Sequence, residues 1–281
     1  MSNPRDTLVL LVTCSRDETR RDLAVEVTKN MAELVPAAGL QDSFMLFDNA
    51  STFADHLSFA PKGAVVVQSP ENIGYWSAIK WVLEHHREYF VRTFKYIYLV
   101  ESDLTHSDLR PLGLCENFLD ATPSASCVRT QEFSVRHRWR YNKDLRFMPF
   151  RNLRSVVRQR NEVTGEKAWF IPPVDGGKIW RSNLHAKLPA LNRIETLCHV
   201  FSELEALGEF SERDFFDFTY RDKKDIGIYD GGLFHQLSTP QTTKIMSGSW
   251  SDVLSLKKMG YQTTRQARFL EIENQPTVSR K

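Results

Sequence analysis

The residues with the clearest chemical potential are Glu101, Ser102 and Asp103, which directly follow the apolar run 96–100. Such a run is typical of a short buried strand. Two carboxylates spaced i, i+2 at the exit of a strand can turn toward one cation once the chain leaves the extended form. Hard divalent cations prefer oxygen ligands, and substrate phosphate commonly completes the coordination of Mg²⁺ or Mn²⁺. The triplet therefore predicts a metal site, and the alternative is a solvated turn.

The elements that must position this triplet follow from the hydrophobic pattern of the first hundred residues. Apolar runs predict four strands, at 7–13, 44–47, 63–67 and 96–100. Residues 17–34 and 72–86 have apolar positions at helical spacing, which predicts two amphipathic helices. Strands that alternate with helices indicate a mainly parallel sheet, and ligands bind beyond the carboxyl ends of such strands.

The second half of the chain has weaker patterns. Residues 127–130 and 168–171 are expected to be strands, residues 193–207 a helix, and residues 231–237 a strand or a loop. The polar tail after Ile272 is expected to be frayed.

Composition fits one large α/β domain with extensions, or a domain with a small lobe. The chain has 281 residues, is 41% hydrophobic and has a formal net charge of +2. No run approaches the roughly 20 apolar residues that span a bilayer, and the polar N-terminus does not look like a signal peptide. The four cysteines form no CxxC pair, which favours reduced thiols in a cytosolic protein over disulfides or a zinc site. A cytoplasmic location is expected.

Four motifs occur in order along the first 105 residues. They are Val12-Thr13-Cys14-Ser15-Arg16, Asp48-Asn49-Ala50-Ser51-Thr52, Glu71-Asn72-Ile73-Gly74 and Glu101-Ser102-Asp103. Together they resemble the nucleotide-sugar-binding half of GT-A fold glycosyltransferases, particularly those of family 2. The resemblance implies a Rossmann-like, mainly parallel sheet flanked by helices, with an irregular acceptor-side C-terminal half. It also implies a donor-binding half at 1–125 and an acceptor-binding, catalytic half at 126–281, in one continuous domain.

The chain departs from this family in three respects. The metal motif is Glu-Ser-Asp where the family has Asp-x-Asp, so Glu101 is expected to act through water or a hydrogen bond. The Gln-x-x-Arg-Trp signature of processive synthases is absent, and so are transmembrane segments. The resemblance therefore implies a soluble enzyme that adds single sugars.

The resemblance assigns roles to particular residues. The donor-binding set is Thr13, Ser15, Arg16, Asp48, Asn72, Gly74, Glu101 and Ser102, and the ligands of Mn²⁺ or Mg²⁺ are Asp103, Glu101 and His235. Simpler structural roles remain open for some of them. Asp48 has the residue type of a turn that bonds its own backbone, Asn72 that of a helix cap, and His235 is also compatible with a structural role.

Inverting transfer needs a general base to deprotonate the acceptor hydroxyl. Asp214 is the first candidate and Glu212 the second, because they open a segment that resembles the family's Glu-Asp segment. Asp230 is a third, since it precedes Gly231 and Gly232. The segment at 175–177 resembles the glycine turn before the family's acceptor helix, which would lie at 180–183. For each acid the alternative is a surface turn or a helix cap.

The segment Arg136–Arg160 contains nine basic residues against the single acid Asp144, with four aromatic residues between them. Such a segment can track a phosphate backbone and stack bases. It can equally hold an anionic glycan, a lipid head group or a diphosphate, or form a solvated face.

The sequence thus predicts a metal-dependent inverting glycosyltransferase that moves a sugar from a nucleotide-diphosphate sugar to a hydroxyl acceptor, such as a glycan or small molecule. One alternative is a glycosyltransferase that acts on modified bases in DNA. The other is a non-catalytic protein that binds nucleotides or nucleic acid on the same scaffold.

Overall fold

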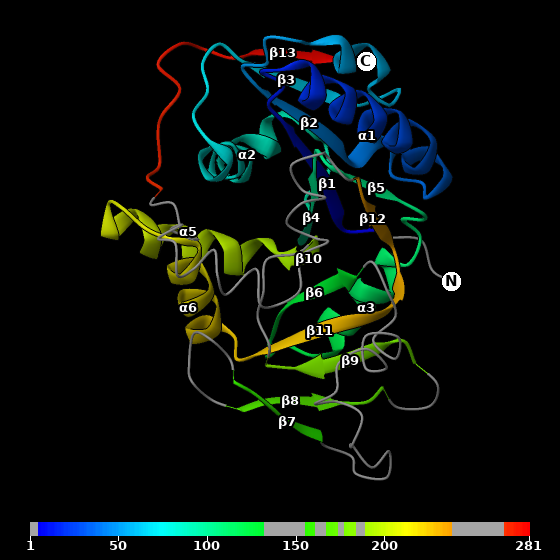
Figure 1. Ribbon diagram of the computed structural model, residues 1–281, viewed down its shortest axis with the longest axis vertical. Coiled ribbons are helices and arrows are strands. Elements are labelled where there is room, and N and C mark those ends of the chain that lie inside the picture. Colours follow the sequence, from blue (N-terminus) through cyan, green and yellow to red (C-terminus); the bar gives the residue numbers. More distant parts are fainter. Residues whose placement is uncertain (1–4, 132–154, 161–166, 174–176, 184–188, 238–266) are drawn as a thin grey trace.

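A computed structural model describes residues 5–131, 155–160, 167–173, 177–183, 189–237 and 267–281. Its centre is an eleven-stranded sheet of order β13-β3-β2-β1-β4-β10-β6-β11-β9-β8-β7, with helices on both faces (Figure 1). Within the described residues no helix is long and apolar enough to cross a membrane. The expected α/β class, with a large sheet flanked by helices, is confirmed.

The first half of the chain forms the parallel part of this sheet. Its strands are β1 (Thr7–Thr13), β2 (Phe44–Asn49), β3 (Val65–Ser69) and β4 (Tyr96–Glu101). Its helices are α1 (Glu18–Ala37), α2 (Tyr75–Tyr89) and α3 (Leu112–Ala121), with short 3₁₀ turns η1 (Gln41–Ser43) and η2 (Asp55–Phe59). β1 pairs in parallel with both β2 and β4. All four predicted strands and both predicted helices are present.

The second half extends the same sheet with mixed strand directions. Its elements are β6 (Ala125–Gln131), β7 (Ser155–Arg160), β8 (Lys167–Ile171), β9 (Ile179–Ser182), β10 (Ala190–Arg193), α5 (Ile194–Leu207), α6 (Glu212–Asp222) and β11 (Asp225–Gly232). β10 lies antiparallel between β4 and β6, so β6 runs in the same direction as β4. β11 pairs in parallel with β6 and therefore shares that direction.

Two expectations for the second half were wrong. Residues 180–182, expected in a helix, lie in β9, which pairs with β11. The tail is not frayed, because it forms β13 (Thr277–Arg280) against the edge of β3. In both places backbone hydrogen bonds to a distant strand decide the structure, and such pairing leaves little local signal in a short segment.

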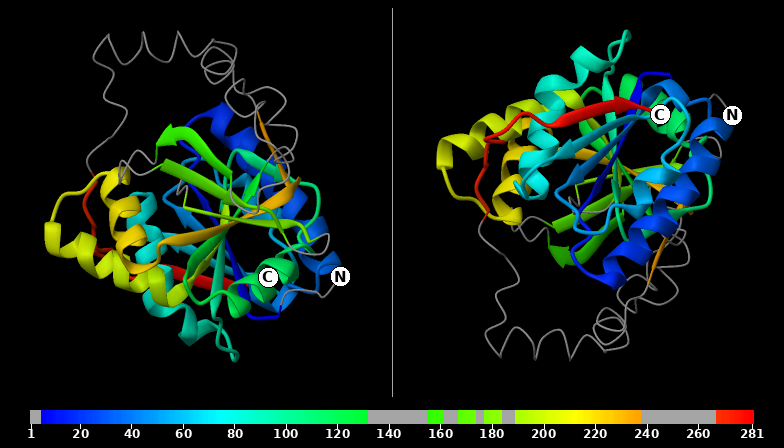
Figure 2. Two further views of the ribbon diagram at one scale, coloured as in Figure 1. Left: turned by 90° about the horizontal axis from the view of Figure 1, so that it is seen from below. Right: turned by 90° about the horizontal axis from the view of Figure 1, so that it is seen from above.

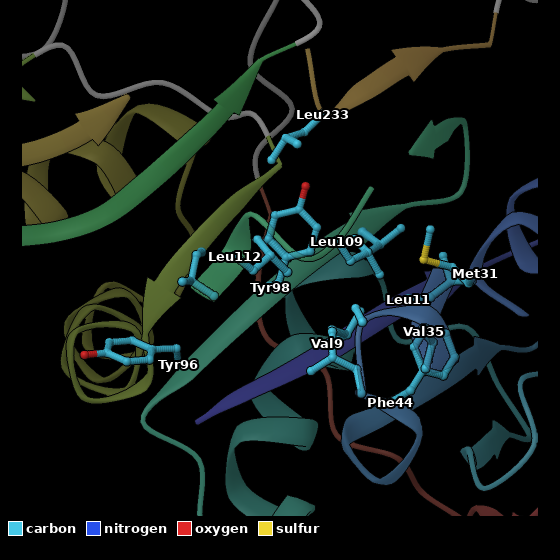
Figure 3. Close-up of a cluster of buried hydrophobic side chains, with 14 of the residues drawn as sticks. Val9, Leu11, Met31, Val35, Phe44, Tyr96, Tyr98, Leu109, Leu112 and Leu233 are labelled. Carbon is cyan, nitrogen blue, oxygen red and sulfur yellow. The ribbon is translucent and has the colours of Figure 1, made fainter. Parts of the chain in front are cut away.

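The hydrophobic core lies on both faces of the sheet, as the alternation along β1 requires. Val9 and Leu11 face the cluster that contains Met31 of α1 and Leu112 of α3 (Figure 3). Leu8, Leu10 and Val12 face the opposite cluster, to which α2 and α5 contribute. β1 is thus buried on both sides at the centre of the molecule, so its carboxyl end is a fixed platform.

A buried carboxylate anchors the other end of β1. Glu116 of α3 is 5% exposed and accepts hydrogen bonds from Arg5 N, Asp6 N and Thr7 Oγ1, the last at 2.6 Å. Two of these donors precede the strand and the third begins it. Glu116 therefore fixes where β1 starts.

Candidate functional site

The carboxyl ends of the parallel strands lie along one edge of the sheet. β2 and β3 lie on one side of β1, and β4 lies on the other. The strand order therefore reverses between β1 and β4, and open α/β sheets bind ligands at such a point. Thr13 ends β1, and Glu101 ends β4, so the predicted motifs lie on either side of this reversal point. β6 and β11 point the same way, which brings the end of β11 to the same edge.

Asp48 is the centre of a buried hydrogen-bond network at the ends of β1 and β2. It is 3% exposed, and its Oδ1 accepts from Thr13 Oγ1 at 3.1 Å and from Ser51 Oγ. His56 of η2 places Nε2 3.3 Å from the same oxygen. The other oxygen, Oδ2, receives a longer bond of 3.4 Å from Ser51 N. We call these four residues the Asp48 network.

The Asp48 network keeps its carboxylate charged. Burial raises the pKa of Asp48, but hydrogen bonds from His56, Ser51 and Thr13, together with the charge of His56, outweigh burial and hold the pKa below its usual value. An ionised carboxylate can only accept hydrogen bonds. A ligand group that meets Asp48 must therefore be a donor, such as a ribose hydroxyl or a base N–H.

The turn after β1 is tied to the turn after β2. Ser15 N donates to Ser51 Oγ at 2.8 Å, and Phe53 N donates to Ser15 O at 3.1 Å. Asp17 then caps α1 through Arg20 N at 2.8 Å. Ser15 is buried, whereas Arg16 is exposed at the start of the helix. The hydrogen bonds of Ser15 thus fix the turn after β1, and the side chain of Arg16 is exposed at the surface of this turn.

Asn72 and Gly74 organise the start of α2. Asn72 Oδ1 accepts from Gly74 N at 2.8 Å and from Asn49 Nδ2 at 3.1 Å, and Asn72 Nδ2 donates to Cys14 Sγ at 3.1 Å. Ile73 N donates to Asn49 Oδ1 at 3.0 Å. These contacts join the ends of β1 and β2 to the first turn of α2, and a helix N-terminus favours an anion.

Gly74 is required by its backbone conformation. Its φ of 86° and ψ of 164° lie in a region that is essentially restricted to glycine. A Cβ placed there would have no heavy atom within 4 Å, so crowding is not the reason for the glycine. The space beside this backbone is open at the predicted donor edge.

The segment after β4 is brought together with His235. β5 (Leu104–His106) pairs antiparallel with β12 (Phe234–Gln236), which sets His235 opposite Thr105. The ladder continues to Asp103, whose carbonyl accepts from Leu237 N at 2.8 Å. Asp103 and His235 are thus diagonal neighbours across two strands, although 132 positions separate them in sequence. Glu101, Ser102 and Asp103 are all partly exposed.

The predicted base residues fall in two different places. Asp230 lies near the end of β11, where its Oδ2 accepts from Trp180 Nε1 at 3.2 Å. Asp214 lies in the first turn of α6, where its Oδ2 accepts from Ser211 N and Ser211 Oγ, both at 2.7 Å. The bond from Ser211 N, with the reciprocal bond from the Asp214 backbone to the Ser211 side chain, forms a helix capping box. Glu212 begins the same helix.

Aromatic contacts place the first turn of α6 near the first turn of α2. Trp76 packs against Phe215 with ring centroids 4.8 Å apart, and against Phe201 at 6.0 Å. Trp76 is therefore a packing residue that joins the two halves of the chain.

The remaining predictions concern the metal site, the basic segment and the glycine turn at 175–177. Among the described residues no group of three His, Cys, Asp or Glu side chains is arranged to hold a metal ion. Residues 136–154 of the basic segment, and Asp175 with Gly176, lie outside the described residues.

Sequence reasoning missed His56 and Asn49 as parts of the site. Asn49 belongs to a quoted motif, and its adjacency to Asp48 is a signal that was available. His56 follows Asp48 by eight positions across a turn and a 3₁₀ helix, so no regular spacing relates the two.

Comparisons with known proteins give likenesses of fold. No protein-family model matches the chain, and no curated protein matches it. Among solved structures, S. aureus TarS aligns over 86% of this chain with 13% identity and a TM-score of 0.48. A cytidylyltransferase from Leptospira borgpetersenii aligns over 47% with 12% identity and a TM-score of 0.35. A mycobacterial protein aligns over 94% with 14% identity and a TM-score of 0.45. This chain spans 38% of the length of TarS, 57% of the cytidylyltransferase and 84% of the mycobacterial protein.

Proposed function

We propose that the protein is a metal-dependent glycosyltransferase that moves a sugar, with inversion, from a nucleoside-diphosphate sugar to a hydroxyl acceptor. The observation that carries the proposal is the pairing of β5 with β12. It brings His235 beside Asp103, at the same sheet edge as the Asp48 network and the first turn of α2. An acidic turn and an anion-favouring helix start at one edge suit a nucleoside diphosphate bound with a divalent cation.

Different residues would bind different parts of the donor. Asp48 accepts a hydrogen bond from the nucleoside, and the open backbone at Gly74 lets the ligand approach the start of α2. Asp103 and His235 would contribute ligands to Mn²⁺ or Mg²⁺, and Glu101 would act through water, because no three of the described side chains are arranged to hold the ion by themselves. These are oxygen and imidazole ligands that suit Mn²⁺, and magnesium sites in enzymes often use one or two carboxylates plus substrate phosphates. When bound, such a cation would neutralise negative charge on the departing diphosphate.

Asp230 is the base that we favour among the three acids. Topology places it at the same edge as Asp103, while the Asp214 carboxylate is occupied by the capping box of α6. In the transfer, the Asp230 carboxylate takes the acceptor's hydroxyl proton. The acceptor oxygen bonds to the anomeric carbon of the sugar as the bond from that carbon to the diphosphate oxygen breaks. The nucleoside diphosphate leaves with the bonding electrons.

The test is thermal melting of the full chain with UDP, GDP, CDP and ADP, each with and without Mn²⁺. A ligand that binds the native state raises the melting temperature. At a ligand concentration of a hundred times Kd, the free energy of unfolding increases by about 2.7 kcal/mol. We expect stabilisation by at least one nucleotide that needs Mn²⁺, and slow Mn²⁺-dependent hydrolysis of the matching nucleotide sugar. If no nucleotide stabilises the protein, the proposed function is wrong. Nucleotide binding without hydrolysis or transfer would favour the non-catalytic alternative.

A further inference from the structure

His56 is a fully buried histidine behind the predicted nucleoside site. It is 0% exposed, lies in η2, and contacts both Thr13 at the end of β1 and Asp48 in β2. No motif in the sequence includes it, and it does not reach the open edge of the sheet. Its polar contacts within the described residues are with the residue that we expect to meet the donor and with that residue's own partner.

The hydrogen-bond directions in this group follow from the number of protons available. The hydroxyl of Thr13 has one proton, which it donates to Asp48 Oδ1 at 3.1 Å. Its oxygen is then left to accept from His56 Nε2, at 2.9 Å. The imidazole therefore donates a proton from Nε2, while Nδ1 has no partner among the described residues. His56 thus donates toward Thr13 Oγ1, and the same Nε2 lies 3.3 Å from Asp48 Oδ1.

We propose that His56 is a positioning residue of the donor site, which acts on Asp48 both directly and through Thr13 to hold its carboxylate in one orientation for the donor's nucleoside. This inference rests on the proposed function. His56 touches neither donor nor acceptor, and its effect is on the charge and direction of Asp48.

Removal of His56 should change how Asp48 titrates. Burial is the largest influence on the pKa of Asp48 and raises it, and His56 provides the first of the hydrogen bonds that oppose burial. The residues opposite Asp48 in the sheet, Thr13 of β1 and Gln68 of β3, are uncharged, and Ser51 in the following turn is uncharged as well. Nothing with a charge in these positions can replace the histidine. Without it, burial dominates and the pKa of Asp48 rises.

The experiment is calorimetric measurement of UDP, GDP, CDP and ADP binding, with Mn²⁺, between about pH 5 and pH 8, because linkage makes affinity follow the titration of a required carboxylate. The variants are His56→Leu, His56→Gln and Thr13→Val, and the control is His86→Leu. His86 is another buried histidine, 2% exposed, which bonds Val82 O at 3.0 Å within α2. The control therefore shows what loss of a buried histidine does elsewhere.

The dependence of wild-type affinity on pH is the reference for the variants, because the metal site and the nucleotide contribute to it equally in all of them. His56→Leu and Thr13→Val should bind about tenfold more weakly at neutral pH, the effect of one hydrogen bond to a charged group, and should weaken further as the pH falls. His56→Gln keeps a side-chain donor and should recover most of the affinity. His86→Leu should change the melting temperature and leave Kd unaltered.

Three results would overturn the inference. If folded His56→Leu binds with wild-type Kd and the wild-type pH profile, His56 only stabilises the fold. If His56→Leu does not fold, Thr13→Val decides. A wild-type Kd and pH profile for Thr13→Val would then show that the His56–Thr13 pair only stabilises the fold. If the wild-type protein binds none of the four nucleotides, the proposed function fails as well, which distinguishes that failure from the first two.

Discussion

At the scale of single residues, the two acids that matter most have opposite surroundings. Asp48 is buried among three partners that hold it ionised, whereas Asp103 is partly exposed in the turn between β4 and β5. A carboxylate already shared by several donors suits a fixed recognition role. A carboxylate at an exposed turn keeps the rotational freedom to take up a cation with a substrate phosphate.

Asp103→Asn should abolish sugar transfer and leave the melting temperature within about 1 °C of wild type, because surface substitutions rarely change stability by more than about 0.5 kcal/mol. An amide is a much weaker ligand for a hard cation than a carboxylate. The measurement is transfer rate against Mn²⁺ concentration. Asp108→Asn is the matched control, since Asp108 lies five residues on and pairs with Arg110 at 2.9 Å. Full activity of Asp103→Asn at ordinary Mn²⁺ would refute the metal assignment.

Asp48→Asn should raise the donor KM more than it lowers kcat. The nucleoside end of the donor binds equally in the ground and transition states, so its loss appears in KM. The variant should also lose roughly 1–3 kcal/mol of stability, because buried partners of the carboxylate are left unsatisfied. Steady-state kinetics and a denaturant melt measure the two effects. An unchanged donor KM would exclude Asp48 from donor recognition.

At the scale of elements, the start of α2 depends on one backbone conformation. Gly74→Ala places a side chain at φ 86°, and should cost about 1–3 kcal/mol from backbone strain. Donor affinity should fall too, because Gly74 precedes the amides that face the ligand edge. Gly208→Ala is the control, at φ 76° after α5, with the same open space around it. It should lower stability similarly and leave Kd unchanged, as urea melts and calorimetry would show. Equal Kd values for both variants would remove Gly74 from the site.

The sequence predicted the elements whose order is set by local pattern. Residues 7–13 form β1 as expected, and α1 and α2 shift by only a few positions at their ends. A strand that is buried on both faces has a continuous run of apolar residues, so β1 to β4 can be predicted from the sequence. β10 has four residues and exists because β4 and β6 pair with it on either side. Its residues 190–193 carry no pattern of their own.

Some parts of the candidate site could likewise be predicted from local sequence patterns, and other parts could not. The ends of β1, β2 and β4 were predictable because parallel strands bring their carboxyl ends to one edge. The position of His235 beside Asp103 was proposed from a resemblance, and only the register of β5 with β12 explains it. The role of Asp214 in a capping box follows from Ser211 three positions earlier, a spacing that was present in the sequence.

At the scale of the whole molecule, the end of the chain holds the two halves together. Phe269 packs against Phe201 and Phe210 at 5.3 Å and 4.8 Å. The chain then crosses α2, where Leu270 N donates to Ser77 Oγ at 2.9 Å, and ends as β13 on the far edge of the sheet (Figure 2). Residues 267–281 therefore link α5, α2 and β3, three elements that support the donor edge.

β13 also covers an exposed strand edge. β3 begins with Val65, Val66 and Val67, and β13 pairs with all three. An uncovered apolar edge strand is a template for association with other chains. Truncation after Pro276 should therefore cause concentration-dependent association and lower the melting temperature by roughly 5 °C through lost backbone hydrogen bonds. Light scattering coupled to size exclusion, at several protein concentrations, measures the first effect.

Ser279→Ala is the control for this truncation, because Ser279 is exposed and its backbone pairing with Val66 does not need the side chain. It should behave as wild type in both measurements. Donor affinity of the truncated protein should stay close to wild type at low concentration, since Phe269, Leu270 and their contacts with α5 and α2 remain. If the truncated chain keeps its association state and its melting temperature, β13 does not protect the edge. If it keeps both but loses donor binding, the tail acts on the donor site directly.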